Sequence, residues 1–158
     1  RVAMKEMTFY KNLEDLDAES KYLVHKAKDA ANLAYAPYSK FHVGAALLLE
    51  DGTYVPGSNQ ENASYPLCMC AERVALYAAA AMYPGKVIKK IAVVAHKKSH
   101  KELSNASSCG ACRQVMREFE ERQGENIEVV MFDDNQWIKC TSTEVLLPLS
   151  FDRGHLKD

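Results

Sequence analysis

At 158 residues, with 47% hydrophobic and 26% charged residues, the sequence fits a globular protein with a full hydrophobic core. Its 20 basic and 21 acidic residues give a net charge of −1, without the basic stripe expected of a nucleic-acid-binding protein. Its apolar runs are too short to cross a bilayer and no secretory signal is recognisable, so we expect a cytoplasmic protein with no membrane partner.

The N-terminal part of the chain is expected to be a tail over residues 1–13, followed by one domain over residues 14–158. A helix is predicted from Asp17, a good N-cap, to about Tyr35. Apolar residues recur there at intervals of three and four, with lysines on the opposite face. Pro37 would end this helix, because the residue before a proline disfavours the α conformation.

A β-hairpin follows. The strand over 42–49 leads into the turn signal Asp51-Gly52 and a return strand over 53–58. Pro56 has no N–H for a sheet ladder, so the return strand should lie at an edge. The polar segment 59–65 comes next and is predicted to be extended.

The second half of the chain alternates helices and strands. The predicted elements are a helix over 70–82, a buried strand over 90–95, a solvated loop over 96–108, a helix over 109–122 that Gly124 ends, strands over 127–132 and 137–140, and a short helix over 144–147 capped by Thr143. This order indicates a layered α/β domain with a mixed sheet of about five strands.

The cysteines indicate metal ligation rather than disulfides. Their number is odd and they form two close pairs, which suits a reducing cytoplasm. Cys68 and Cys140 are plausible as small buried hydrophobic residues. Cys109 and Cys112 have the spacing of a metal or redox motif.

Three of the cysteines stand at predicted helix N-termini. Cys109 and Cys112 would share one side of a first helical turn, and Cys70 would begin the other helix. Helix N-termini favour thiolates. Because zinc takes four ligands, three thiolates would leave one position for water, as in catalytic sites.

Alternative uses of the cysteines remain open. The pair could be a thioredoxin-like redox motif, although such motifs follow the first strand of a fold and no cis-Pro-like partner strand is evident here. Cys68 could join the other three in a closed Cys₄ site, or all could be core residues. The last alternative leaves Glu72 and Arg73 without a role.

The charged residues beside the cysteines fit catalysis. Glu72 lies in the first helical turn after Cys70, within reach of a water on the metal, where it could take up and deliver protons. Three thiolates leave the centre negative, and Arg73 could offset this charge by donating to a sulfur. Arg113 is a weaker candidate for the same task.

A family resemblance covers most of the chain. Cys-x-Glu followed by Cys-x-x-Cys resembles the zinc-deaminase pattern His-x-Glu…Pro-Cys-x-x-Cys, with Cys70 in place of His and Ser108 in place of Pro. Together with the blocks 38–47, 57–65 and 146–148, the motifs resemble the small homotetrameric zinc-dependent cytidine deaminases of nucleoside salvage. The resemblance implies their three-layer α/β/α fold and free nucleosides as substrates.

The resemblance also implies roles for individual residues. One zinc per subunit would be bound by Cys70, Cys109 and Cys112, with Glu72 as the proton shuttle in hydrolytic deamination of cytidine or deoxycytidine. The implied substrate-binding residues are Phe41, Asn59, Glu61, Tyr65 and Ala71, joined by Phe151, which would reach a neighbouring subunit's active site in a homotetramer.

The polar segment agrees with these roles. In an extended chain residues 59 and 61 project to the same side, where they could offer an amide and a carboxylate to sugar hydroxyls. A carboxylate there repels phosphate. The alternatives are a deaminase of another cytosine nucleoside and a zinc-stabilised binding protein without catalysis; a single-stranded DNA editor is disfavoured by the neutral charge.

Overall fold

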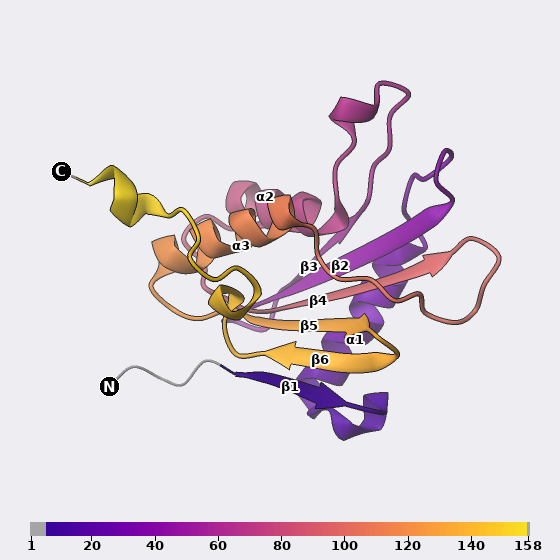
Figure 1. The fold of residues 1–158 in the computed structure, drawn as a ribbon, viewed down its shortest axis with the longest axis horizontal. Coiled ribbons are helices and arrows are strands. Elements are labelled where there is room, and N and C mark those ends of the chain that lie inside the picture. Colours follow the sequence, from indigo (N-terminus) through magenta and orange to yellow (C-terminus); the bar gives the residue numbers. More distant parts are fainter. Residues whose placement is uncertain (1–5, 158) are drawn as a thin grey trace.

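The apolar run Ala45–Leu49 lies in a strand next to the edge of a six-stranded sheet, and it is buried because helices cover both faces of that sheet (Figure 1). The computed structural model describes residues 6–157. The strands are arranged in the order β1-β6-β5-β4-β2-β3, with β4 and β5 parallel and the other neighbours antiparallel. Their bounds are Met7–Tyr10 (β1), Phe41–Leu49 (β2), Tyr54–Ser58 (β3), Ile88–Lys97 (β4), Glu128–Asp133 (β5) and Gln136–Cys140 (β6).

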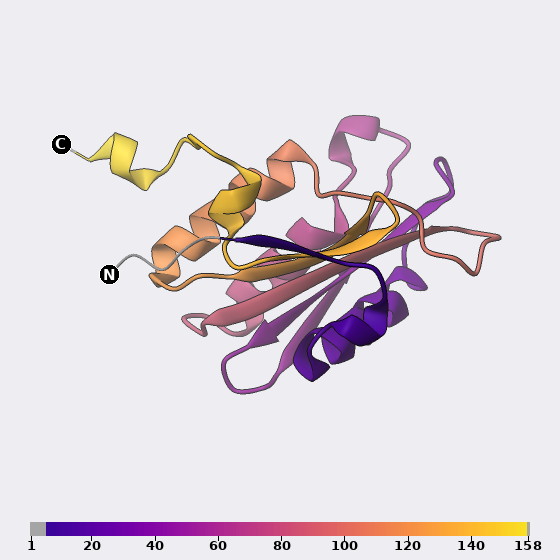
Figure 2. The ribbon, with the colours of Figure 1, turned by 60° about the horizontal axis from the view of Figure 1, so that its bottom comes forward.

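Alternate side chains of the strands enter two different cores. Ala45, Leu47 and Leu49 pack with α2 (Ala71–Met82) and α3 (Gly110–Gln123). Ala46 and Leu48 pack on the opposite face with α1 (Ala18–Ala31). Figure 2 shows α1 on one side of the sheet and α3 on the other. The predicted three-layer α/β/α fold with a mixed sheet is therefore confirmed.

The sheet has six strands instead of about five, because Met7–Tyr10 form β1 at its edge. The expectation of a tail over residues 1–13 is thus wrong for this stretch, and residues 1–5 lie outside the described residues. β1 pairs antiparallel with β6, from Met7 opposite Cys140 to Tyr10 opposite Trp137. Its side chains are mostly exposed, so no buried periodicity marks it in the sequence. The single domain over 14–158 stays a prediction.

Helix α1 begins as predicted and ends early. The Asp17 side chain caps it by accepting from the backbone nitrogen of Ser20 at 3.0 Å. The helix stops at Ala31, before the predicted end at Tyr35. Tyr35 instead pairs its backbone with the polar segment 59–61, donating to Asn59 O at 3.0 Å and accepting from Glu61 N at 2.9 Å. Because these backbone groups pair with a distant segment, residues after Ala31 leave the helix and form the loop before β2.

Two glycines allow helices to approach the sheet closely. A Cβ at Gly44 would lie 2.0 Å from the backbone oxygen of Ala27 in α1. A Cβ at Gly57 would lie 2.5 Å from the backbone oxygen of Ala71, the first residue of α2. The absence of a side chain at Gly57 therefore lets the N-terminus of α2 rest on β3.

Several of the remaining predictions are confirmed. Gly124 ends α3 in the left-handed conformation, with φ of 70°. β3, which contains Pro56, lies at the edge of the sheet, as predicted. The short last helix is a 3₁₀ turn over Thr143–Leu146, and its cap is Ser142 rather than Thr143, because the Ser142 hydroxyl accepts from Glu144 N. None of the helices in the described residues is long and apolar enough to cross a membrane.

Candidate active site and metal centre

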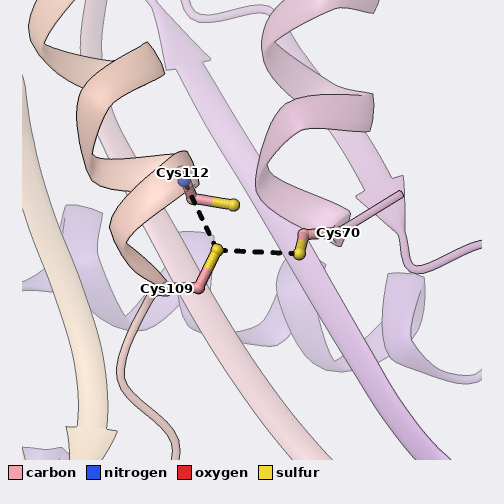
Figure 3. Close-up of side chains that lie close together, drawn as sticks. All are labelled: Cys70, Cys109 and Cys112. Atoms are coloured by element: carbon pink, nitrogen blue, oxygen red, sulfur yellow. Dashed lines mark hydrogen bonds between the residues drawn. The ribbon is translucent and has the colours of Figure 1, made fainter. Parts of the chain in front are cut away.

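Three cysteine sulfurs meet where the N-termini of α2 and α3 converge (Figure 3). Cys70 is the N-cap residue of α2, Cys109 is that of α3, and Cys112 lies in the first turn of α3. The three sulfurs lie within 4.8 Å of one another, with 3.9 Å between those of Cys70 and Cys109. The positive ends of both helix dipoles favour negative charge at this point.

The hydrogen bonds around the sulfurs suit thiolate ligands. Cys109 Sγ accepts from the backbone nitrogen of Cys112 at 3.4 Å, and Cys70 Sγ accepts from Arg73 Nη2 at 3.4 Å. Sulfurs that face one another and receive N–H donors from outside match a metal site with N–H···S support. Three such sulfurs fit zinc, with a fourth position open for water or substrate.

The pKa values of Cys70 and Cys112 are shifted in opposite directions. A hydrogen bond from the Cys112 thiol, with a further one from Arg73, lowers the pKa of Cys70 to about 5. The same bond to Cys70, together with burial and the carboxylate of Glu72, raises the pKa of Cys112. Of these two sulfurs, the one beside the guanidinium is thus the more readily ionised.

Glu72 is buried at the second position of α2, with 4% of its surface exposed. Burial, with a smaller effect of the nearby Cys70 charge, raises the pKa of its carboxyl group. A carboxyl group that holds a proton more readily than usual is suited to both accepting and returning it. Glu72 therefore has the environment of a proton shuttle.

A cavity of about 340 Å³ opens beside this cluster. Four of the predicted substrate-binding residues line it, together with Glu72 and two of the three sulfurs. The lining includes Phe41, Asn59, Glu61, Cys70, Ala71, Glu72 and Cys109, and also Ser39, Val93, Ala106 and Ser107, which the sequence analysis did not single out. Ala106 and Ser107 belong to a loop without periodicity, and only their position just before Cys109 hinted at a role.

Asn59 is fixed to the start of β2, and Glu61 is fixed to the loop just before it. Asn59 accepts from Val43 N at 2.8 Å and donates to Phe41 O at 2.9 Å. Glu61 Oε1 accepts from the backbone nitrogens of Tyr38 and Ser39, and Oε2 accepts from the Ser39 hydroxyl at 2.6 Å. The Ser39 hydrogen bond lowers the pKa of Glu61, which keeps the carboxylate ionised. Backbone groups thus orient both side chains at the cavity wall.

Tyr65 and Phe151 lie outside the cavity of their own chain. Tyr65 packs edge-on against Tyr38 at 5.7 Å and lines an adjoining hollow, which it shares with Ser39 and Glu61. Phe151 is 58% exposed and stacks on His155 at 5.3 Å. Figure 1 shows the C-terminal segment extending away from the sheet beyond α3.

The other cysteines do not belong to the cluster. Cys68 accepts from the backbone nitrogen of Asn62 at 3.3 Å and is not among the three converging sulfurs. Cys140 is buried in β6. The structure therefore argues against the Cys₄ alternative, in which Cys68 would complete the set.

The loop before α3 is tied down without proline. The carbonyl of Ser108 accepts from Arg113 Nε at 2.8 Å, and Arg113 Nη1 donates to Leu146 O at 3.0 Å. Arg113 thus connects this loop to the 3₁₀ turn and makes no hydrogen bond to the sulfurs. Of the two candidate arginines, Arg73 is the one that donates to a cysteine.

Comparisons with known proteins agree with this site. Residues 17–124 match the model of the cytidine and deoxycytidylate deaminase zinc-binding region. A cytidine deaminase of Halalkalibacterium halodurans is 50% identical over 97 residues, covering 61% of this chain and 69% of the relative. One of Sporosarcina psychrophila is 40% identical over 134 residues, covering 85% and 92%.

Solved structures show the same similarity. The crystal structure of a cytidine deaminase from Burkholderia pseudomallei aligns with a TM-score of 0.67 and 44% identity, covering 86% of this chain and 100% of that one. The Mycobacterium tuberculosis enzyme aligns with a TM-score of 0.65 and 33% identity, covering 85% and 98%. Because the family model matches residues 17–124, more than half of the chain, the chain belongs to the zinc-binding cytidine and deoxycytidylate deaminase family.

Proposed function

We propose that this chain catalyses the zinc-dependent hydrolysis of cytidine or deoxycytidine to uridine or deoxyuridine, with release of ammonia. One observation carries the proposal: three sulfurs converge from two helix N-termini beside a cavity, which two of them line together with the buried side chain of Glu72. Family membership supports the same reaction.

Cys70, Cys109 and Cys112 would hold one zinc ion per chain. When bound, zinc supplies Lewis acidity that lowers the pKa of a water molecule at its open position. Three thiolates make the centre negative, and the hydrogen bond that Arg73 donates to Cys70 offsets part of this charge.

Glu72 would carry the protons of the reaction. It takes a proton from the attacking water and delivers it to N3 of the cytosine ring. The water oxygen bonds to C4, Glu72 passes the second proton to the amino group, and the C4–N bond breaks to release ammonia. Each proton taken from water thus ends on the base or on the leaving group.

The other cavity residues would bind the nucleoside. Phe41 and Ala71 supply apolar surface, and Asn59 and Glu61 supply an amide N–H and a carboxylate to sugar hydroxyls. The ionised Glu61 disfavours a phosphate on the sugar, which makes free nucleosides the substrates rather than nucleotides or nucleic acid. The net charge of −1 is consistent with this choice.

A homotetramer with shared active sites is part of the proposal. The exposed Phe151, on a segment extending from the body of the chain, is available to a neighbouring subunit's site, and Tyr65 is exposed as well. Light scattering measures the oligomer. Mixing inactive Glu72→Gln chains with inactive Phe151→Ala chains should restore activity if Phe151 acts across subunits, and should restore none if each site is built from one chain.

We also propose a cytoplasmic location. All five cysteines are free in the structure, and three of them converge as metal ligands would. Such thiols are best preserved in a reducing compartment.

The deciding experiment combines metal analysis with a cytidine assay on the purified protein. One zinc per chain with ammonia release and the absorbance change of uridine formation supports the enzyme. Zinc without turnover of any cytosine nucleoside would instead identify a zinc-stabilised binding protein. Turnover of a modified cytosine nucleoside in preference to cytidine would reassign the substrate.

A further inference from the structure

The hydroxyl of Ser39 connects Glu61 to the first residue of β2. Its oxygen lies 2.6 Å from Glu61 Oε2 and 3.1 Å from the backbone nitrogen of Phe41. The Phe41 N–H can only donate, so Ser39 Oγ accepts from it. The single proton of the hydroxyl is then directed at Glu61. The backbone N–H of Phe41 thus fixes the direction of both hydrogen bonds.

The two oxygens of Glu61 are used differently. Oε1 accepts from two backbone N–H groups, those of Tyr38 at 3.0 Å and Ser39 at 3.1 Å, which fill its two acceptor positions. Within residues 6–157, Oε2 accepts only from the Ser39 hydroxyl. One acceptor position of Oε2 therefore remains for a hydroxyl in the adjoining cavity.

The backbone of Phe41 also orients the second polar side chain at this wall. Phe41 O accepts from Asn59 Nδ2 at 2.9 Å, which leaves the other N–H of that amide for a ligand. The preceding residue, Lys40, has a φ of 58°, a left-handed conformation that is uncommon outside glycine. Such a conformation persists where surrounding contacts hold it, and it is often found beside binding sites.

We infer that Ser39 is a positioning residue for sugar recognition, whose hydroxyl holds Glu61 Oε2 towards the cavity in register with Asn59. The inference rests on the proposed function, in which Glu61 accepts a hydrogen bond from a sugar hydroxyl. Ser39 directs its only proton to Glu61 and acts through that carboxylate. Since the sugar is remote from the reacting C4–N bond, the loss of this contact should weaken binding of substrate and transition state equally.

The test is a double-mutant cycle of Ser39→Ala and Glu61→Ala, with Ser64→Ala as the matched control. The Ser64 hydroxyl lies in the same polar segment and makes no hydrogen bond within the described residues. Ser39→Ala should raise KM for cytidine by about 10-fold, as expected for one hydrogen bond to a charged group, and leave kcat within about twofold. Ser64→Ala should leave both constants unchanged.

Two further readouts separate positioning from a general structural effect. The KM penalty of Ser39→Ala should vanish in the Glu61→Ala background. It should also vanish with one of the two cytidine analogues that lack the 2′ or the 3′ hydroxyl, because that analogue has no proton for Glu61. Additive effects of the two substitutions, an equal penalty with every analogue, or a fall in kcat at unchanged KM would overturn the inference.

Measuring the same cycle by calorimetric binding of uridine keeps this inference separate from the proposed function. If the wild type binds uridine but releases no ammonia from cytidine, the proposed function fails and the binding cycle still tests Ser39. If it deaminates cytidine and the cycle is additive, the role of Ser39 fails alone. A wild type that neither binds nor deaminates nucleosides overturns both.

Discussion

The guanidinium group of Arg73 donates a hydrogen bond from Nη2 to the sulfur of Cys70 at 3.4 Å. The two residues are three positions apart, so the first turn of α2 carries both the sulfur and the charge that stabilises its ionised form. In the described part of the chain, no other arginine donates a hydrogen bond to a cysteine.

Replacing Arg73 with Gln should therefore weaken zinc binding. Removing a donor to a metal ligand typically costs roughly 10- to 100-fold in affinity. Competition with a chromophoric chelator measures the change, and Arg122→Gln, at the far end of α3, provides a control with the same loss of charge. Equal zinc affinity in the Arg73 variant and the wild type would show that the contact has no role in holding the metal.

Glu72→Gln should retain zinc and lose nearly all turnover. The amide is close in size to the carboxyl group but cannot accept and return protons, and the loss of such a group costs roughly 10²- to 10⁴-fold in kcat. Ammonia release and zinc content are measured on the same preparation, with the exposed Glu125→Gln as control. Substantial remaining activity would remove Glu72 from the proton-transfer steps.

Lys90 should contribute more to stability than its neighbour Lys89. The Lys90 side chain is 2% exposed, and its Nζ lies within 3.2 Å of carboxylates from Asp17, Glu19 and Glu128. Lys90→Met would leave these partly exposed acids without their shared cation, at a cost of about 2–3 kcal/mol in the free energy of unfolding.

Lys89→Met is the matched control for this prediction. Lys89 pairs with Glu19 at 3.0 Å, but both side chains are exposed, so the loss should stay below about 1 kcal/mol. Urea denaturation of the two variants gives the comparison. Equal destabilisation would show that burial of Lys90 adds nothing to its ion pairs.

Stability should fall in acid partly because of Asp17. Although partial burial opposes the shift, hydrogen bonds from Ser20 and Lys139 hold the pKa of Asp17 well below its usual range. A lowered pKa in the folded state means that the stabilisation is present at neutral pH and is lost as pH falls below about 4. Asp17→Asn keeps a capping side chain, so its deficit against the wild type at pH 7 should shrink as pH is lowered. A deficit that is constant with pH, measured by urea denaturation, would contradict this assignment.

Gly57→Ala should disturb both the fold and the metal site. The new Cβ would lie 2.5 Å from the backbone oxygen of Ala71 and 2.6 Å from the nitrogen of Ala75, so α2 would have to shift. We expect a loss of about 3 kcal/mol in unfolding free energy, with weaker zinc binding because α2 positions Cys70. Gly85→Ala has no atom within 4 Å of its Cβ and should cost about 1 kcal/mol, for its positive φ, without loss of zinc affinity.

Each half of the metal centre could be predicted from local sequence because it lies within one helical turn, whereas only the fold brings the two helices together. Cys109 and Cys112 share one helical turn, and Cys70 and Arg73 share another, so spacing along the chain is sufficient to bring each pair to one side. The buried strands were similarly predictable, because their apolar runs reflect burial on both faces of the sheet.

Long-range hydrogen bonds determine the position of β1 and the end of α1, which the local sequence pattern did not predict. β1 is an edge strand with exposed side chains, and its place is set by backbone pairing with β6, about 130 residues away along the chain. Tyr35 leaves the predicted helix because its backbone pairs with Asn59 and Glu61. The periodicity of apolar side chains does not predict such backbone hydrogen bonds.

The same distinction applies to the cavity wall. The motif suggested Asn59 and Glu61, but only the folded chain shows that the Ser39 hydroxyl and the Phe41 backbone orient them. The sequence by itself determined which chemical groups this protein has and which lie on a common helical turn. Tertiary structure decided which of those groups already have hydrogen-bond partners and which retain free capacity, because donors and acceptors distant in sequence meet only in the folded chain.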